Sequence, residues 1–411
     1  MKKICAILVL CSMILLLLAP ITIDAKIYNT APKAEEDTVA VAVTAMVDAQ
    51  MDLSSPSVVL IEGSTGTIIY EKNKDEQLKP ASITKVMTLL LIFEALESGQ
   101  IKPMDDVSVS EHAASMGGSQ VYLEPYEVQN VDTMIKCISV ASANDASVAM
   151  AEYIAGSEEE FVARMNQRAK ELGMMNTNFV NCYGLDTDNH YSSAYDVALM
   201  SRELITKFPQ ISNYSTIWMD TIVHTTKKGK SEFGLTNTNK LVKFYNGVTG
   251  LKTGSTSLAK YCLAATARRN DMDLIAVIMA APDTKTRFME ASKLLNYGFA
   301  NYSIFTDENT DTPLEPVRVV KGVADTVQGK IGNSFSYLCA KGRTPENIRK
   351  EIILYEEVPA PVAASDKIGD IIYYYDNEKI GSVDIIAKEA IDKAGFKDCF
   401  FKVLKRYFIA K

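Results

Sequence analysis

The sequence predicts an α/β fold of the α+β kind, in which helices flank an antiparallel sheet and an all-helical block separates its strands. Strand–turn–strand patterns stand near both ends of residues 56–305, and helical periodicity fills much of residues 110–205 between them. A change of composition follows near Pro313 and Pro316, and the short apolar runs beyond it indicate a small β-rich domain at 312–388. A chain of 411 residues is long enough for these separate folded parts.

The first residues have the layout of an export signal. Lys2 and Lys3 precede an apolar run over residues 4–19, and Ala25 closes a plausible cleavage site. This layout predicts a secretory signal peptide at residues 1–25, with an uncleaved membrane anchor as the alternative because the apolar run is long. We expect the remaining chain to be exported and residues 26–55 to form an N-terminal lead-in.

The elements of the main domain follow from hydrophobic periodicity. A hairpin is expected where two strand-like runs flank Gly63-Ser64-Thr65-Gly66, and a second where two such runs flank Arg269-Asn270-Asp271. Strands separated in this way can join one antiparallel sheet. The strand-like runs are 58–61, 67–70, 261–267 and 274–281, and the helical runs are 131–140, 146–155, 159–172 and 284–297.

The C-terminal part ends in an amphipathic segment at 389–411. Its apolar residues fall on one helical stripe, and basic residues occupy much of the remaining surface. Such a helix suits a membrane interface, and packing against the β-rich domain is the alternative. The stripe comprises Phe396, Phe400, Val403, Leu404, Tyr407 and Phe408, and the basic residues are Lys397, Lys402, Lys405, Arg406 and Lys411. Strands are expected before it at 317–320, 334–340, 351–355, 371–375 and 380–386.

Charge and cysteine usage argue against several classes of protein. The formal charge of −8 and a pI near 5.2 disfavour a general nucleic-acid binder. The cysteines beyond the predicted signal peptide are odd in number and widely spaced, which does not indicate a disulfide framework. His112, His190 and His224 lack the spacing of metal ligands, and we expect each to be a surface or turn residue. No metal and no cofactor is therefore expected.

The stretch Ser82-Ile83-Thr84-Lys85 is the first candidate for chemistry. Pro80 stands just before a helix-forming run, which places Ser82 near a helix N-terminus and Lys85 on the same helix face. A serine hydroxyl becomes a good nucleophile when a neighbouring base takes its proton, and a lysine amine can be that base if its pKa is lowered. Alone this pattern is common, so its weight depends on the rest of the chain.

Two further motifs follow in a telling order. Ser142-Ala143-Asn144 lies at a break between helical patterns, and Lys252-Thr253-Gly254 enters a strand. Ser-x-x-Lys, Ser-x-Asn and Lys-Thr-Gly together are typical of penicillin-binding proteins and β-lactamases. With these motifs, the chain resembles the low-molecular-mass D-alanyl-D-alanine carboxypeptidases of the serine-type penicillin-binding protein family over nearly its whole length. The resemblance implies a penicillin-binding/serine β-lactamase-like transpeptidase fold with a catalytic domain at 56–305.

The resemblance also implies a role for each motif residue. Ser82 would attack the peptide carbonyl between two D-alanines and form an acyl-enzyme, with Lys85 as its base. Ser142 would relay a proton to the leaving amine, and Asn144 would orient Lys85 and the substrate amide. The backbone N–H groups of Ser82 and Ser255 would form the oxyanion hole.

The third motif would bind the carboxylate at the end of the substrate. Lys252 would add positive potential, Thr253 would hydrogen-bond the carboxylate, and Gly254 and Ser255 complete this substrate-binding stretch. Arg287 is a further candidate for the carboxylate, with a solvated helix arginine as the alternative. Two lysines in one site repel each other, which would lower the pKa of at least one.

The implied partners are peptidoglycan pentapeptide stems, β-lactam antibiotics as inhibitors, and a membrane surface for the terminal helix. The expected location is the outer face of the cytoplasmic membrane.

Two residues depart from the family pattern: Ala143 stands where glycine is common, and Lys260 stands where glycine often precedes the aromatic residue. The first keeps a small side chain, and the second could alter the local strand geometry.

Three competing functions remain to be weighed. A β-lactamase uses the same first steps, but in one class it needs a positioned glutamate for deacylation, and no clear counterpart of that glutamate loop is found. A catalytically inactive peptidoglycan-binding scaffold would lack motif residues, whereas all of them are present here. A Ser-His-Asp hydrolase is disfavoured because the chain has no G-x-S-x-G motif.

Overall fold

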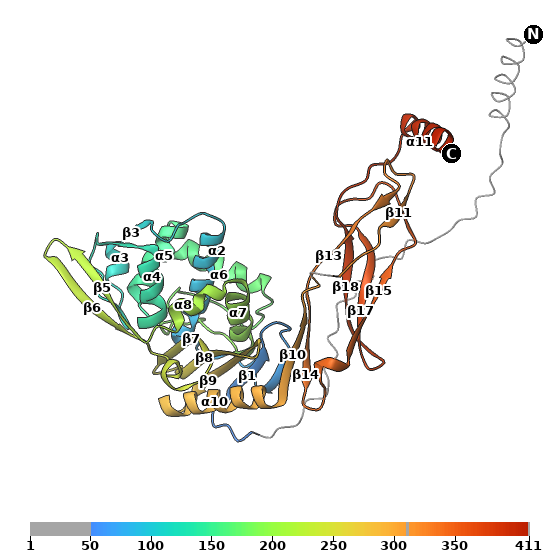
Figure 1. The fold of residues 1–411 in the computed structure, drawn as a ribbon. Helices are drawn as coiled ribbons and strands as arrows, with labels where there is room; N and C mark the ends of the chain where they lie inside the picture. The colour runs from blue at the N-terminus through green and yellow to red at the C-terminus, as the bar shows by residue number, and fades with distance from the viewer. Residues whose placement is uncertain (1–50, 310–311, 410–411) are drawn as a thin grey trace, which may run out of the picture. The chain divides into compact units, whose positions relative to one another are not determined.

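The structure is a computed structural model, and it describes residues 51–309 and 312–409. The predicted signal peptide and most of the predicted lead-in lie outside these residues. Figure 1 shows the described helices and strands in chain order.

The main domain is built on a five-stranded antiparallel sheet with the strand order β2-β1-β9-β8-β7. The chain enters this sheet through the β1–β2 hairpin and returns to it much later, where β9 pairs with β1. Both predicted hairpins are confirmed, and so is their union in one sheet. The strands are β1 (Ser57–Glu62), β2 (Ile68–Lys72), β7 (Val248–Thr256), β8 (Lys260–Arg269) and β9 (Met272–Ala281).

The two faces of the sheet belong to two separate cores, because successive side chains of a strand point to opposite faces. Val59 and Ile61 of β1 lie in the core shared with the helical block, whereas Val58 and Leu60 lie in the core on the other face. That second core includes residues of α10 (Thr284–Asn301), which confirms the predicted closing helix. Figure 1 shows α10 along one side of the sheet and the helical block on the other.

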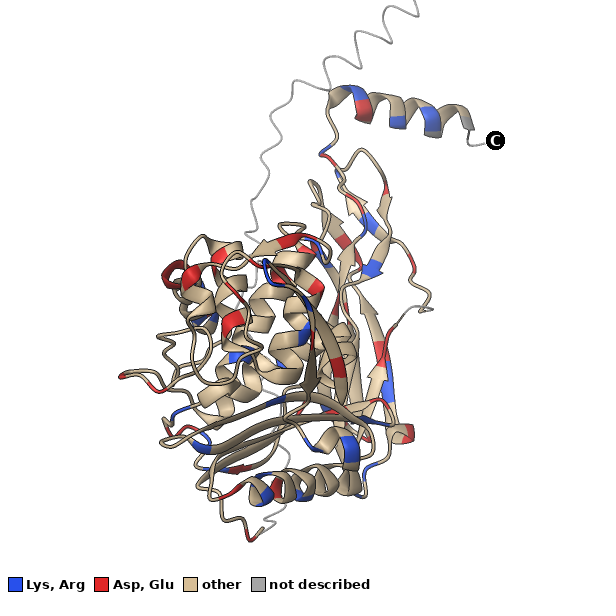
Figure 2. Cartoon of the chain, turned by 90° about the vertical axis from the view of Figure 1, so that its left-hand side faces the viewer, with Lys and Arg blue, Asp and Glu red and all other residues tan. Residues whose placement is uncertain are grey.

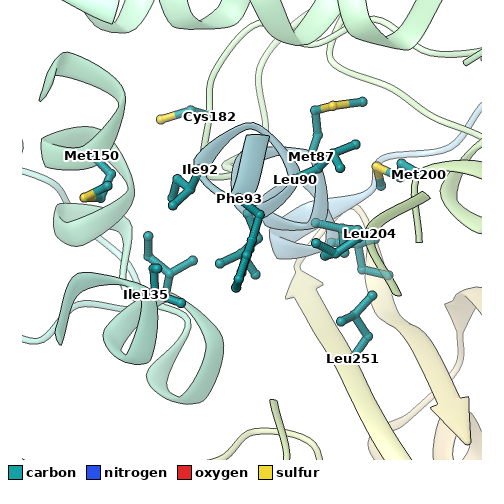
Figure 3. Close-up of a cluster of buried hydrophobic side chains, with 14 of the residues drawn as sticks. Met87, Leu90, Ile92, Phe93, Ile135, Met150, Cys182, Met200, Leu204 and Leu251 are labelled. Carbon is teal, nitrogen blue, oxygen red and sulfur yellow. The ribbon is translucent and has the colours of Figure 1, made fainter. Parts of the chain in front are cut away.

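Helix α2 (Lys85–Glu97) lies at the centre of the helical block. Most of its residues are buried, as expected for a helix that is apolar on nearly all sides. In Figure 3 its side chains lie among residues of several surrounding segments, including Ile135, Met150 and Leu204. The Ser-x-x-Lys motif therefore begins a helix that is fixed on every side. The other helices are α3 (Glu111–Ala114), α4 (Val131–Lys136), α5 (Asn144–Ala155), α6 (Glu158–Glu171), α7 (Ala194–Lys207), α8 (Ser212–Ser215) and α9 (Leu241–Phe244), with the shorter turns η1 (Ala81–Thr84), η2 (Cys137–Ala141) and η3 (Pro209–Ile211).

Two antiparallel strand pairs of the main domain fall outside the predictions. β3 (Asp106–Ser108) pairs with β4 (Val128–Asn130), and β5 (Met219–Thr226) pairs with β6 (Gly229–Thr236). Most side chains of β5 and β6 are exposed, so these strands lack the apolar runs by which the other strands were found. Their Thr, Ile and Val residues still favour extended backbone.

The C-terminal part consists of short strands around a third core, which includes Ile368, Ile371, Tyr373 and Ile385. All of the strands predicted there are present, and the predicted terminal helix is α11 (Phe396–Ile409). The elements are β10 (Tyr302–Asp307), β11 (Val317–Val320), β12 (Thr326–Val327), β13 (Gly329–Ile331), β14 (Phe335–Ala340), η4 (Pro345–Asn347), β15 (Ile348–Leu354), β16 (Glu357–Pro359), β17 (Lys367–Tyr375) and β18 (Glu378–Ala387).

Candidate active site

Ser82 lies in the 3-10 turn η1, which runs directly into α2. Its side chain is half-buried and thus keeps some access to solvent. Strand β7 passes very close to this turn: a Cβ on Gly254 would lie 2.8 Å from the Pro80 carbonyl oxygen and 2.9 Å from the Ser82 nitrogen. Only glycine allows this approach, which gives a physical reason for the last residue of the Lys-Thr-Gly motif.

The amine of Lys85 is wholly buried and touches three oxygen atoms. Its Nζ lies 3.1 Å from Ser82 Oγ, 2.6 Å from Asn144 Oδ1 and 2.7 Å from the carbonyl oxygen of Tyr183. Burial lowers the pKa of Lys85 to about 7, because a charged ammonium is disfavoured away from water. The structure thus brings the first two motifs together around one amine that readily loses its charge.

Ser142 occupies the break between η2 and α5, as predicted, with a left-handed backbone at φ +62°. Its hydroxyl is buried and has no hydrogen-bond partner among the described residues. Asn144 begins α5, and its amide spans the site: Oδ1 accepts from Lys85, and Nδ2 donates to the Gly117 carbonyl at 2.6 Å. Asn144 therefore fixes both the lysine and the loop that contains Gly117.

Lys252 and Thr253 lie on β7, and both side chains are buried. Burial lowers the pKa of Lys252 well below its usual range, and the nearby charges of Lys85 and Arg287 lower it further. The predicted repulsion between the two lysines is present, but burial is the larger cause. Thr253 Oγ1 donates to Thr238 Oγ1 at 2.7 Å, which ties the motif to the loop after β6.

Arg287 lies in the first turns of α10 and is only 6% exposed, so the alternative of a solvated helix arginine is wrong. Its Nη1 donates to the carbonyl oxygens of Gly254 and Cys262, at 3.0 and 3.2 Å. These carbonyls belong to the neighbouring strands β7 and β8, so the guanidinium braces the end of the Lys-Thr-Gly strand. It also adds positive charge near Lys252.

Sequence reasoning missed several groups that complete the site. The Tyr183 carbonyl could not be found, because every residue has a carbonyl and only the fold selects one. Asp145 follows Asn144 directly, and its carboxylate accepts from the backbone N–H groups of Val121 and Leu123, which holds the loop after Gly117. The position of Asp145 directly after the Ser-x-Asn motif was the feature of the sequence from which its role could have been predicted.

Two of the three histidines are buried, and only His224, on strand β5, contradicts the prediction of a surface or turn position, because the His190 N–H closes a turn onto the Thr187 carbonyl at 3.2 Å. His190 is 1% exposed and His224 is 7% exposed, so both are buried, whereas His112 is exposed as expected. Each buried ring has polar partners that offset the loss of water; His224 Nδ1, for example, lies 2.8 Å from Glu127 Oε1. In the described ranges, no group of three or more His, Cys, Asp or Glu residues is arranged to hold a metal ion.

Lys260, the second departure from the family pattern, has a left-handed backbone with φ +55° at the start of β8. Glycine adopts this conformation without strain, so the substitution does bear on the local strand geometry.

A separate hollow of about 710 Å³, lined in part by Phe93, Phe208 and Tyr214, contains none of the motif residues.

The arrangement can carry out nucleophilic attack on a carbonyl. A half-accessible hydroxyl touches an amine whose pKa is lowered, and two further basic side chains are buried nearby, Lys252 from β7 and Arg287 from α10. Such a site suits a substrate that carries a carboxylate close to the bond that is cleaved.

The comparisons with known proteins agree with this geometry. A family model described as D-alanyl-D-alanine carboxypeptidase matches residues 43–283, and one described as penicillin-binding protein 5, C-terminal domain, matches residues 306–393. The chain is 45% identical over 340 residues to the D-alanyl-D-alanine carboxypeptidase DacF of Bacillus subtilis, which covers 83% of this chain and 86% of that relative.

Solved structures show the same fold. Penicillin binding protein 5 from Haemophilus influenzae matches with a TM-score of 0.69 and 31% identity, over 84% of this chain and 99% of that one. Penicillin-binding protein D2 from Listeria monocytogenes, in the ampicillin-bound form, matches with a TM-score of 0.53 and 30% identity, over 61% of this chain and 99% of that one. The chain therefore belongs to the D-alanyl-D-alanine carboxypeptidase family, and it is a serine-type peptidase with the fold of the penicillin-binding proteins.

Proposed function

We propose that Ser82 is the nucleophile with which this enzyme removes the terminal D-alanine from peptidoglycan stem peptides. The observation that carries the proposal is the surroundings of the Lys85 amine. A neutral amine has two N–H groups and one lone pair, and Lys85 has two fixed acceptors, Asn144 Oδ1 and the Tyr183 carbonyl. Its lone pair is then left for the hydroxyl of Ser82, 3.1 Å away.

The reaction follows from this arrangement. Ser82 Oγ attacks the carbonyl carbon between the two D-alanines while its proton moves to Lys85 Nζ. Backbone N–H groups of Ser82 and Ser255 stabilise the oxyanion, and such preorganised donors are worth about 3 kcal/mol each. The C–N bond then breaks, and the Ser142 hydroxyl passes a proton from Lys85 to the leaving amine. Water hydrolyses the acyl ester and restores the Ser82 hydroxyl.

Lys252, Thr253 and Arg287 bind the carboxylate of the terminal D-alanine in this proposal. The support is electrostatic: Lys252 and Arg287 are buried near the amine of Lys85, and burial lowers the pKa of Lys252 in the free enzyme. A carboxylate beside them favours the protonated ammonium, because an opposite charge stabilises the charged form. Arg287 acts partly through the strand, since it already holds the Gly254 carbonyl.

Mass spectrometry after penicillin treatment tests the assignment of Ser82. The wild-type protein should gain the mass of one penicillin, on the peptide that contains Ser82, and Ser82→Ala should gain none. Thr88→Ser, which keeps a hydroxyl in the same helix, serves as the control and should still be labelled at Ser82. Labelling of the Ser82→Ala protein at another residue would refute the assignment.

Nitrocefin separates this proposal from a β-lactamase. The loop beside Lys85 provides the Tyr183 carbonyl and Asp186, and the Asp186 carboxylate already accepts from Thr256 Oγ1 at 2.9 Å. Residues 180–190 of this loop contain no glutamate, and Glu158, which lies against the loop, is already engaged by the Cys182 N–H at 3.3 Å and by His112 Nε2 at 3.1 Å. A single stoichiometric burst is expected, whereas sustained turnover would favour a β-lactamase. Release of D-alanine from a peptide ending in D-Ala-D-Ala excludes an inactive scaffold.

We further propose that the exported enzyme rests on the outer face of the cytoplasmic membrane through α11. Six large apolar side chains of this helix are more than half exposed: Phe396, Phe400, Phe401, Val403, Tyr407 and Phe408. Leu404 is the partly covered member of the predicted stripe, and Lys402 donates to the Gly322 carbonyl at 2.8 Å. Figure 2 shows Lys and Arg at intervals along the same helix. No helix in the described ranges is long and apolar enough to cross a bilayer.

Flotation with lipid vesicles tests the membrane proposal. The described face of α11 is apolar and flanked by basic residues, which suits the interface of a bilayer with anionic headgroups. Replacing Phe400 and Phe408 by serine should release the protein from such vesicles. Phe244→Ser is the control, since Phe244 is about as exposed as Phe408 but lies outside α11. Unchanged flotation of the double variant would contradict the proposal.

A further inference from the structure

His190 is a buried residue of the loop 178–192, which packs against the turn η1 that contains Ser82. Backbone bridges hold this loop at both ends: Asn178 pairs with Tyr191, and Ser192 pairs with Leu78. The imidazole has one polar partner on each side. Its Nε2 lies 2.8 Å from Thr84 Oγ1, and its Nδ1 accepts from the backbone N–H of Val180 at 3.0 Å.

The neighbours of His190 decide which nitrogen carries the proton. Thr84 Oγ1 donates its hydrogen to the Ala81 carbonyl at 2.9 Å, so it can only accept from His190. The N–H of Val180 needs an acceptor, so Nδ1 must be without a proton. The ring is therefore the neutral Nε2–H tautomer, and it donates to Thr84 while it accepts from Val180.

This one ring connects both halves of the nucleophilic pair. Through Thr84 it reaches the carbonyl of Ala81, whose left-handed backbone at φ +48° leads directly into Ser82. Through Val180 it holds the loop whose Tyr183 carbonyl accepts from Lys85. The loop and the turn are also in direct contact, since a Cβ on Gly184 would overlap the Ala81 carbonyl oxygen.

We propose that His190 is a positioning residue that sets the distance between the Ser82 hydroxyl and the Lys85 amine, through Thr84 on one side and Val180 on the other. The inference rests on the proposed roles of Ser82 and Lys85. Reacting groups that are displaced by about 1 Å can lose roughly 100-fold in rate, so a rigid brace at this place controls the chemistry more than the binding of substrate.

The surroundings of His190 keep its hydrogen-bond pattern constant. Burial lowers the pKa of His190 to about 4, and the charge of Lys79 lowers it further, against an opposing effect of Asp186. The ring of Phe179 packs edge-on at a centroid distance of 5.9 Å. The imidazole thus stays neutral over the pH range in which Lys85 changes its charge. A proton on Nδ1 would oppose the N–H of Val180 and open the loop.

A double-mutant cycle tests the brace. Thr84→Val removes the hydroxyl with almost no change of shape, and His190→Asn keeps an acceptor for Val180 but loses the contact with Thr84. We expect each single variant to lower the rate constant of acylation by benzylpenicillin by about 10-fold to 100-fold. The dissociation constant of the preceding non-covalent complex should change by less than about threefold. The double variant should be no more than about twofold slower than the slower single one, because both changes break the same contact.

Two control variants separate positioning from stability. Thr84→Ser retains the hydroxyl and should restore acylation to within about threefold of wild type. His224→Gln breaks the buried contact of His224, on β5, with Glu127; it should lower the free energy of unfolding and leave the acylation rate constant unchanged. Acylation rates that simply follow unfolding free energies across all variants would overturn the proposal, as would additive effects in the cycle.

Spectra of the wild-type protein keep the proposal testable even if a variant does not fold. In protein that contains ¹⁵N-labelled histidine, the NMR signals of one imidazole ring should be those of the neutral Nε2–H tautomer from pH 5 to 8. The same signals should remain in the His112→Gln and His224→Gln variants. An Nδ1–H tautomer, or titration of this ring near pH 6.5, would contradict the inference. If the wild-type protein is not acylated at Ser82, the proposed function itself is wrong. If the wild-type protein is acylated normally and the Thr84→Val and His190→Asn variants react at the same rate, only the role of His190 is wrong.

Discussion

Lys85 shows how the surroundings of a single amine select its working state. Burial disfavours the ammonium, and the two acceptors Asn144 Oδ1 and the Tyr183 carbonyl match the two N–H groups of the neutral form. The spacing of Ser82 and Lys85 could be read from the sequence, because a turn of helix brings positions three apart to one face. The third contact could not, because it comes from a backbone carbonyl in a loop nearly a hundred residues away.

The rate of acylation should therefore depend on pH through Lys85. Its pKa is lowered to about 7, so below that pH the ammonium predominates and has no lone pair for the Ser82 proton. The rate constant for acylation by benzylpenicillin should fall about tenfold for each pH unit below 7 and level off above about pH 8. Stopped-flow measurements from pH 5.5 to 9 provide the profile, with circular dichroism to confirm that the protein stays folded. A rate that is constant across this range, or that rises as the pH falls, would contradict the assignment of the base.

Hydrophobic periodicity in the sequence predicted the helices and strands that bury apolar side chains, but it did not predict the strands that are mostly exposed. β1, β8 and β9 supply apolar residues to the cores of the main domain, and the runs that predicted them coincide with the observed strands. β5 and β6 are mostly exposed and stayed hidden, although their hairpin leads to Thr238, the partner of Thr253. Packing of one element against another, such as β7 against η1, depends on distances that no local pattern contains.

The close contact of β7 with η1 predicts a large effect of one methyl group. In Gly254→Ala, the new Cβ would lie within 3.0 Å of atoms of Pro80, Ala81 and Ser82, so the strand or the turn must move. We expect a loss of about 1–3 kcal/mol in the free energy of unfolding, as for other overpacked sites, and a loss of at least tenfold in acylation rate. Gly234→Ala on β6 is the matched control, since its Cβ would meet no atom within 4 Å. Denaturant titration and penicillin labelling of both variants give the comparison, and equal behaviour of the two would show that β7 does not constrain the turn.

At the scale of the whole molecule, basic side chains gather in two places although the net charge of the chain is negative. The chain carries a formal charge of −8, yet Lys85, Lys252 and Arg287 are buried close together at the candidate active site, and lysines recur along α11. The first arrangement suits a carboxylate-ended substrate, and the second suits an anionic lipid surface. The composition alone indicated only an acidic protein that does not bind nucleic acid generally, because a net charge does not show where the charges gather.

The lysines of α11 should make membrane association dependent on salt and on lipid charge. Lys397 and Lys405 are exposed, and each basic residue near an anionic surface is worth about 1 kcal/mol, so replacing both by glutamine should weaken binding to anionic vesicles by roughly tenfold or more. The same substitution at exposed Lys379, near the start of β18, should change binding by less than about twofold. Vesicles without anionic lipid, or 0.5 M salt, should remove the difference between variants, because screening suppresses the attraction. Equal losses from Lys379→Gln and from the α11 substitutions would mean that the protein responds to total charge rather than to this helix.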